Sequence, residues 1–204
     1  MVNERKEIEN IRFHSLNGDK IENIMRFINK ETLREQHYRQ ISKKAKGIDN
    51  VSKEMYEVNL DENLENLISK MKTLGYKPKP VRRIYIPKDN GKTRPLGLPS
   101  YEDRLVQSKM TEILNAIYEP KFMECSYGFR PNRNCHQALK EINDNIMFKS
   151  KNYIIEADIK GFFDNVNHSK LIKQLWTSGV RDKNLLSLIS KMLKAEVFGL
   201  GVPE

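Results

Sequence analysis

Apolar residues recur at every third or fourth position in several stretches of the chain, which is the spacing of one face of an α-helix. This pattern predicts helices over residues 18–40, 61–74, 101–119, 134–149, 168–178 and 183–193. Residues whose side chains can accept hydrogen bonds from free backbone N–H groups stand at most of the expected starts: Asp19, Asp61, Ser100, Asn167 and Asp182. Residues 41–59 lack the periodicity and predict a loop or a weakly ordered connector.

Shorter runs rich in β-branched and aromatic residues predict strands at residues 81–87 and 93–98. Asn90 and Gly91 between them form the dipeptide that a tight hairpin turn prefers, so we expect an antiparallel pair. Further strand candidates end at Asp158 and span residues 195–199. Because strands and helices do not alternate regularly, the predicted fold class is α+β, a mixed and helix-rich protein with an antiparallel β-hairpin.

The charge of the chain narrows the choice of partners. The 204 residues include 36 Lys and Arg against 27 Asp and Glu, which gives a formal net charge of +9. This excess points to a polyanion, and nucleic acid is the first candidate. No run approaches the roughly 18 apolar residues that span a bilayer, and the N-terminus has no apolar segment typical of a secretory signal. We therefore expect a cytoplasmic protein without a membrane partner, and no zinc site, because Cys125 and Cys135 lack ligand spacing.

The most informative chemistry lies after residue 152. A short apolar run from Tyr153 delivers Asp158 at its end, and the chain then turns at Gly161 into two aromatic residues and Asp164. Magnesium takes oxygen ligands and is commonly held by one or two carboxylates together with substrate phosphates. The segment therefore predicts that Asp158 binds a divalent metal ion, and that this ion carries a phosphate. An unrelated nuclease that uses Asp158 and Asp164 would be one reading of this pair.

Three blocks in the chain together resemble one family. Residues 83–107, with Ile-Pro-Lys-Asp-Asn-Gly-Lys-Thr-Arg-Pro-Leu-Gly, resemble the fingertip hairpin of group II intron-encoded reverse transcriptases. Residues 126–139 and the segment around Asp158 resemble two further blocks of that family, in the expected order. The resemblance implies an N-terminal helical extension (1–60), fingers (61–152) with a fingertip hairpin (81–99), and the first part of a right-hand palm (153–204).

The resemblance also implies roles for individual residues near the reacting groups. Asp158 would be the catalytic carboxylate and a metal ligand, and the carbonyl of Ile159 would be a further metal ligand in a two-magnesium site. Deoxynucleoside triphosphates would meet basic residues of the fingertip and the turn after Asp158: Lys88, Arg94, Gly161, Phe162 and Phe163. Lys92 is an alternative to Lys88 or to Arg94 as a residue that holds the triphosphate. Phe163 would exclude a ribose 2′-hydroxyl, and ordinary core packing is the alternative role for Phe162.

Basic residues elsewhere are candidates for RNA contacts. Arginine offers a planar fork to phosphate oxygens, and lysine offers a compact charge. The candidates for template or intron RNA are Lys43, Lys44, Lys46, Arg82, Arg83, Arg130 and Arg133. A solvated charged face with no ligand is the alternative for the three lysines.

These features predict part of a reverse transcriptase and maturase that copies RNA into DNA and binds group II intron RNA to aid its splicing. The sequence has no Tyr-x-Asp-Asp motif, which in this family carries the remaining catalytic carboxylates. We therefore expect this chain to bind RNA template, DNA primer and intron RNA without polymerising alone. The alternatives are an RNA-binding module only, and a retron or diversity-generating reverse transcriptase. Apolar surface left by an unfinished sheet makes a homodimer a further hypothesis.

Overall fold

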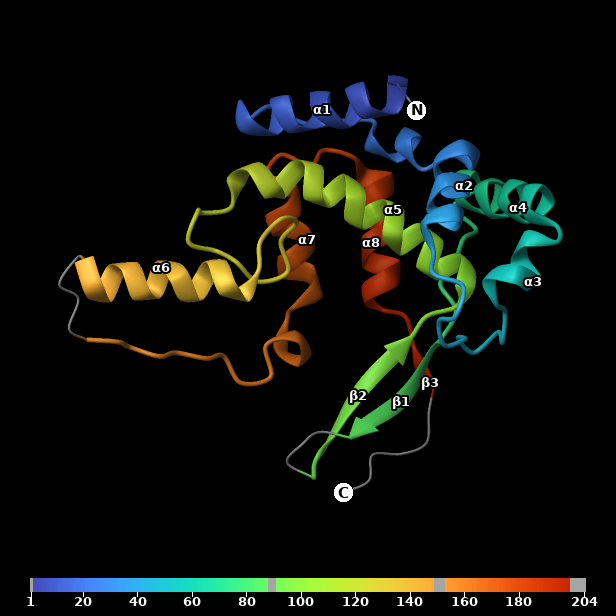
Figure 1. Cartoon of the computed structure of the whole chain (residues 1–204). Helices are drawn as coiled ribbons and strands as arrows, with labels where there is room; N and C mark the ends of the chain where they lie inside the picture. Colours follow the sequence, from blue (N-terminus) through green and yellow to red (C-terminus); the bar gives the residue numbers. More distant parts are fainter. Residues whose placement is uncertain (1, 88–90, 149–152, 199–204) are drawn as a thin grey trace.

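The structure, a computed structural model, describes residues 2–87, 91–148 and 153–198 (Figure 1). Its α-helices are α1 (Val2–Leu16), α2 (Lys30–Arg39), α3 (Lys53–Glu57), α4 (Leu60–Lys72), α5 (Tyr101–Tyr118), α6 (Cys135–Phe148), α7 (His168–Thr177) and α8 (Lys183–Leu193). Short 3-10 helices are η1 (Ile24–Phe27), η2 (Glu119–Lys121) and η3 (Phe163–Asn165). The strands are β1 (Val81–Pro87), β2 (Thr93–Leu98) and β3 (Val197–Phe198). This mixed, helix-rich composition with one small sheet confirms the predicted α+β class.

Helix α5 lies at the centre of the helical part, with α1, α2 and α8 around it (Figure 1). Its buried side chains recur at helical spacing and include Leu105, Val106 and Ile113, which are fully buried. Apolar residues from the other helices complete the core: Ile11, Ile24, Leu33, Leu64, Leu67, Leu185 and Ile189. Residues from all three predicted subdomains thus share one core, and their division into extension, fingers and palm stays a prediction.

The N-terminal region differs from the predicted single helix over residues 18–40. Helix α1 ends at Leu16, and Gly18 and Asn23 then adopt positive φ of 73° and 53°. Helix α2 begins only after Asn29, whose side chain accepts a hydrogen bond from the Thr32 backbone N–H. The prediction was wrong because the apolar residues between these points face the core from a turn and a short 3-10 helix.

The turn between α1 and α2 is tied to a distant part of the chain. Ile21 donates its backbone N–H to the Gly179 carbonyl at 2.8 Å and accepts from the Arg181 N–H at 2.8 Å. Met25 donates its backbone N–H to the Asp182 carboxylate at 2.7 Å. Asp182 also accepts from the start of α8, so one buried acid caps a helix and anchors the N-terminal region.

The hairpin agrees with its sequence prediction in both strands. β1 pairs antiparallel with β2 from Arg82 opposite Leu98 to Pro87 opposite Thr93. The two-residue β3 adds to the other edge of β1 as a parallel strand, with Val81 opposite Val197. The predicted turn at residues 88–90 lies outside the described residues, while Gly91 after it has a positive φ of 75°.

The predicted helix caps divide into two groups. Ser100, Asn167 and Asp182 accept backbone N–H groups at the starts of α5, α7 and α8, as predicted. Asp19 and Asp61 do not cap helices: Asp19 pairs with His14 at 2.9 Å, and Asp61 pairs with Arg34 from the first turn of α4. The two predictions were wrong because no described helix begins directly after Asp19, and because Asp61 lies within α4, after its N-cap residue Asn59.

The predicted strand that ends at Asp158 is not formed. Residues 153–159 have no regular secondary structure, and their side chains are exposed, with Ile155 93% exposed. A strand needs a neighbour to accept and donate its backbone hydrogen bonds. No described strand lies beside this segment, which explains the difference. No described helix is long and apolar enough to cross a membrane.

Candidate nucleic-acid interface

The hairpin separates its arginines onto two faces. Side chains of directly opposite residues in an antiparallel pair lie on the same face of the sheet. Ile86 is opposite Arg94, and Arg82 lies four residues before Ile86 on β1, so Arg82 and Arg94 share one face. Arg83 lies on the other face, and all three arginines are exposed. The hairpin therefore presents positive charge on both faces, while Lys88 lies outside the described residues.

The connector at residues 41–50 is held firmly against the base of this hairpin. A Cβ placed on Gly47 would lie 2.4 Å from the Pro99 carbonyl oxygen, so glycine permits a backbone contact there that a larger residue would block. The Asp49 carboxylate accepts from the Tyr101 backbone N–H at 3.3 Å and pairs with Lys79 at 3.4 Å. Arg104 donates to the Ala45 carbonyl at 2.8 Å. Residues 41–50 are thus the predicted loop, held in the folded structure and not weakly ordered, whereas Lys53–Glu57 of the same predicted connector form helix α3.

This contact produces a groove between the connector and the sheet, here named the interface groove. It has a volume of about 520 Å³, and its lining includes Tyr85 and Phe198. Its lining comes from both segments: Gly47, Ile48, Asn50, Arg82, Arg83 and Ile84. Lys43, Lys44 and Lys46 are exposed on the same connector. The structure therefore brings the connector that carries these lysines against the strand that carries Arg82 and Arg83, while the lysines themselves lie outside the lining of the groove.

Arg130 is placed inside the protein and not on its surface. Its Nε and one terminal nitrogen donate to the Glu119 carboxylate at 3.0 and 2.9 Å. The other terminal nitrogen donates to the Met123 and Ser126 carbonyls at 2.8 and 2.7 Å. The side chain is 6% exposed and its guanidinium lies over the Phe122 ring. These contacts give Arg130 a role in organising its loop, and an RNA contact from it stays a prediction.

Arg133 has a similar but more exposed arrangement. It pairs with the Glu124 carboxylate, donates to the Glu124 carbonyl at 3.2 Å and lies over the Tyr127 ring. This hydrogen bond to Glu124 raises the pKa of Arg133 and lowers the pKa of Glu124. Glu124 itself is highly exposed, so a phosphate could replace it as the partner of Arg133.

The segment that carries the predicted catalytic acid, residues 153–163, is here named the motif segment. Asp158 and Ile159 are both exposed. Gly161 has a positive φ of 61°, and its carbonyl accepts from the Asn165 side chain at 2.8 Å, which closes the turn into η3. Phe162 and Phe163 are exposed and lie edge to face with ring centres 5.5 Å apart. The turn is formed as expected, but core packing of Phe162 is not seen.

The residues of this turn do not by themselves form a metal site. Within residues 2–87, 91–148 and 153–198, no three His, Cys, Asp or Glu side chains gather closely enough to hold a metal ion. Magnesium generally needs further carboxylates or substrate phosphates beside a single acid. The role of Asp158 as a metal ligand therefore stays a prediction.

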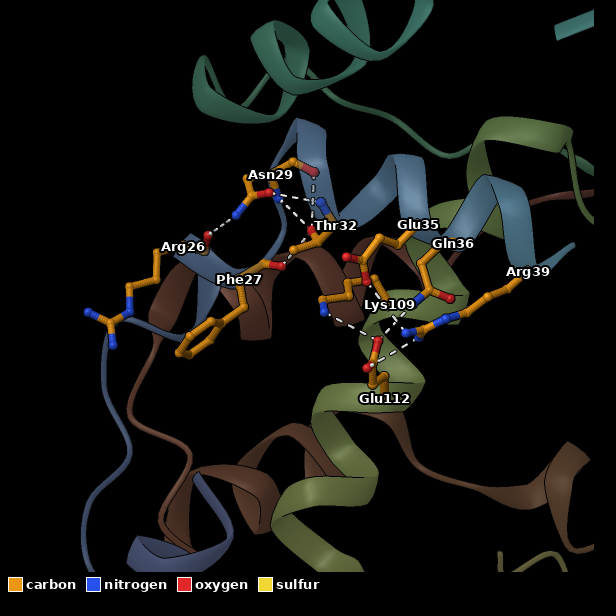
Figure 2. Close-up of polar contacts among 9 residues, drawn as sticks. All are labelled: Arg26, Phe27, Asn29, Thr32, Glu35, Gln36, Arg39, Lys109 and Glu112. Carbon is orange, nitrogen blue, oxygen red and sulfur yellow. Dashed lines mark hydrogen bonds and ion pairs between the residues drawn. The ribbon is translucent and has the colours of Figure 1, made fainter. Parts of the chain in front are cut away.

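Sequence reasoning missed a charged cluster between α2 and α5 (Figure 2). The Glu112 carboxylate accepts from Gln36 at 2.7 Å and pairs with Lys109 at 3.2 Å and with Arg39 at 3.4 Å. Lys109 is fully buried. Its position between Val106, Met110 and Ile113 on the apolar face of the helix could have revealed it. The cluster fixes α2 on α5, beside the connector that follows α2.

Comparison with known proteins supports the reading of the three blocks. The family model for "Reverse transcriptase (RNA-dependent DNA polymerase)" matches residues 86–202, more than half of the chain. The "Group II intron-encoded protein LtrA" of Lactococcus lactis subsp. cremoris is 45% identical over 136 residues, which cover 66% of this chain and 22% of that protein. "Protein YkfC" of Escherichia coli is 36% identical over 159 residues, covering 76% of this chain and 42% of that protein.

A plant protein extends the range of relatives. The "Nuclear intron maturase 2, mitochondrial" of Arabidopsis thaliana is 33% identical over 97 residues, 48% of this chain and 13% of that protein. The chain therefore spans less than half the length of each of these relatives. The resemblance to group II intron-encoded reverse transcriptases and maturases, drawn from the sequence, is confirmed. The chain belongs to the reverse transcriptase family of RNA-dependent DNA polymerases.

Proposed function

We propose that this chain is the RNA-binding part of an RNA-directed DNA polymerase and intron maturase. The observation that carries the proposal is the interface groove, where the connector and the hairpin base place basic and aromatic side chains together. Positive charge that follows a groove neutralises phosphates, and aromatic rings offer a face for unpaired bases. The whole protein would copy RNA into DNA and bind group II intron RNA to aid its splicing.

The RNA would contact the connector and the hairpin together. Lys43, Lys44 and Lys46 would meet phosphates along the connector, while Arg82 and Arg83 would reach the strand from the two faces of β1. Arg133 would join them if phosphate replaced Glu124, its present partner. Because these contacts are mostly to phosphates, they would position RNA without reading its sequence.

The fingers, the first part of the palm and the polymerase site belong to the same proposal. Lys88 and Arg94 of the fingertip would hold the triphosphate of a deoxynucleotide, and Gly161 and Phe162 would lie against it. Phe163 would exclude a 2′-hydroxyl. Asp158 and the Ile159 carbonyl would supply part of a magnesium site, which needs further carboxylates. We therefore propose that this chain alone binds RNA and does not extend a primer.

The test is equilibrium binding of the chain to group II intron RNA and to an unrelated RNA duplex across a salt series. Each phosphate contact contributes roughly 0.7 to 0.9 to the log–log salt slope. Replacement of Lys43, Lys44 and Lys46 together by alanine should lower the slope by about 2. Replacement of Lys170, Lys173 and Lys183 removes the same charge from α7 and α8 and should leave it unchanged. Equal losses from both triple variants would contradict the proposed groove.

The second candidate function is an RNA-binding module with no recognition of an intron. It is favoured by the exposed motif segment, which brings no cluster of metal ligands together among the described residues. Binding to both RNAs that disappears equally at high salt would support this module. Tighter binding to intron RNA that survives high salt would support the maturase. A retron or diversity-generating type would also lack that preference.

Self-association is a separate part of the proposal. Apolar side chains are exposed on one face of α6 and along the motif segment: Leu139, Ile142, Ile146, Ile154 and Ile155. Large exposed apolar surfaces mark interaction sites. A homodimer would cover them, and sedimentation at the monomer mass across micromolar concentrations would contradict it.

A further inference from the structure

The loop over residues 122–134 carries an aromatic residue in an unusual conformation. Phe129 has a positive φ of 56°, and its side chain is fully exposed. A positive φ is rare for a bulky residue, and such strain is concentrated at functional and ligand-binding sites. Asn132, three residues later, has a φ of 61°. The loop thus holds a large apolar ring in water at a cost in backbone energy.

The loop is held in this shape by its own arginines. Arg130 bonds to two carbonyls of the loop and to Glu119 of η2, and Arg133 bonds to the Glu124 carbonyl. Tyr127 donates its hydroxyl to Glu141 of α6, which connects the loop to the next helix. Both arginines turn inward, and Phe129 turns outward. The ring is therefore presented by a scaffold that is already organised before any ligand binds.

A second, independent feature adjoins the loop. Pro131 helps to line a groove of about 660 Å³, whose lining also includes several residues of α5, Arg12 of α1 and Arg39 of α2. Arg104 and amide and hydroxyl side chains of α5 also line it, as does Glu112. Arg12 is exposed, and Arg39 is 58% exposed although it pairs with Glu35 and Glu112. The groove thus gathers cationic side chains from α1, α2 and α5, and its lining includes Pro131, two residues after Phe129 in the sequence.

We propose that Phe129 stacks on an unpaired RNA base while the sugar–phosphate backbone of the same strand runs into this arginine-lined groove. The inference rests on the proposed RNA-binding function and names its ligand as single-stranded RNA. Aromatic stacking tolerates any base because every base has a flat face. Duplex RNA keeps its bases stacked inside the helix, so it cannot use this ring in the same way. The site is separate from the interface groove on the hairpin.

An apolar protein partner would use the same ring differently. Docking of a protein surface needs apolar area, which leucine supplies almost as well as phenylalanine. Stacking on a base needs the aromatic face, which leucine lacks. The neighbouring arginines favour a polyanion, and the substitution of one residue by three different side chains separates the two occupants.

The experiment measures fluorescence anisotropy of the chain with a labelled ten-nucleotide polyuridine RNA and with a labelled RNA duplex. We expect Phe129→Ala and Phe129→Leu to weaken binding of the single strand by about tenfold, and Phe129→Trp to keep it. Duplex binding should change less than about twofold, because phosphate contacts dominate there. Met123→Ala removes another exposed apolar side chain from the same loop and should change neither affinity.

The outcomes separate this inference from the function on which it rests. If the Phe129→Ala or the Phe129→Leu protein binds the single strand as tightly as the unmodified chain, the stacking site is overturned. RNA binding by the chain would still stand in that case. Absence of binding to either RNA by the unmodified chain overturns the proposed function and this site together. Thermal unfolding of each variant checks that the loop variants fold, and Phe129→Gly should melt at least as high because it relieves the positive φ.

Discussion

Helices α5 and α6 are both amphipathic, yet they occupy opposite environments. Nine of the 18 residues of α5 are buried, including charged Lys109 and Asp103. All 14 residues of α6 lie in the described part of the chain, and none of their side chains is buried. Leu139, Ile142 and Ile146 form an apolar face on α6 that remains exposed. An apolar stripe therefore predicts that a helix has a partner, and the position of that partner depends on the rest of the fold.

The same contrast separates the two functional regions. The interface groove is built on elements that contact α5, through Gly47 on Pro99 and Asp49 on Tyr101. The motif segment follows α6 and is exposed along its length. The proposed RNA-binding surface is thus supported by the core, whereas the predicted catalytic acid is not. This difference explains why we propose RNA binding without polymerisation for this chain.

The largest expected difference is between a core leucine and a motif-segment isoleucine. Leu105→Ala should reduce the free energy of unfolding by about 3 to 4 kcal/mol, because it opens a cavity in the fully buried centre of α5. Ile155→Ala should change it by less than about 0.5 kcal/mol, since the side chain is exposed. Denaturant unfolding measures both. A loss of 2 kcal/mol or so for Ile155→Ala would show that the motif segment is packed in solution.

The charged cluster should matter nearly as much as the apolar core. Glu112→Ala should cost about 1 to 3 kcal/mol, because it removes a carboxylate that accepts from Gln36 and pairs with the buried Lys109. Glu35→Ala removes a single pairing partner of Arg39 at the surface and should cost less than about 1 kcal/mol. Chemical denaturation of the two variants gives the comparison. Equal costs would mean that the cluster is solvated and does not fix α2 on α5.

The contact between the connector and the hairpin base can be broken with one methyl group. Gly47→Ala would place Cβ against the Pro99 backbone, so we expect a loss of about 1 to 3 kcal/mol in stability and weaker RNA binding. Gly128→Ala is the matched control, because a Cβ there meets nothing within 4 Å. Thermal unfolding and RNA titration measure both effects. Normal RNA affinity in a destabilised Gly47→Ala protein would separate the connector from the RNA surface.

The smallest predicted effect is a pH dependence that comes from the core. His37 is fully buried, its Nδ1 lies 2.8 Å from the Tyr101 hydroxyl, and its Nε2 lies 3.8 Å from the Glu57 carboxylate. Burial lowers the pKa of His37 below its ordinary value of 6.5, and Glu57 opposes this only in part. The unfolded chain then binds the proton more readily than the folded protein does.

The contribution of neutral His37 to the free energy of unfolding should therefore be fully present above about pH 6.5. It should be lost as the pH drops below that value. Further titratable groups lie near the His37 ring: Tyr38 of α2, and Lys53 and Tyr56 of α3. His37→Gln should flatten the dependence between pH 5 and 7, about the range where histidine titrates. An unaltered slope in His37→Gln would assign the dependence to other groups.

Local signals in the sequence were sufficient for the hairpin and for several caps. The turn dipeptide at Gly91 and the side chains of Ser100 and Asp182 act on neighbouring residues, so their effects can be predicted from short stretches. The docking of Gly47 on Pro99 joins residues far apart and has no local signal. Helix α1 was missed because its polar and apolar residues show little periodicity. The motif segment differs in the opposite way: its sequence predicts a strand, but no described strand lies beside it to pair with.

Amide hydrogen exchange, measured with and without a single-stranded RNA, tests the central comparison most directly. We predict slow exchange in α5 and α8 and immediate exchange at residues 153–159. RNA should slow exchange at residues 44–50 and 81–87 and should not slow it in the motif segment. Exchange reports local opening for each part of the chain. Slow exchange at residues 153–159 before RNA is added, or RNA-induced slowing there without any at the connector and β1, would contradict the account.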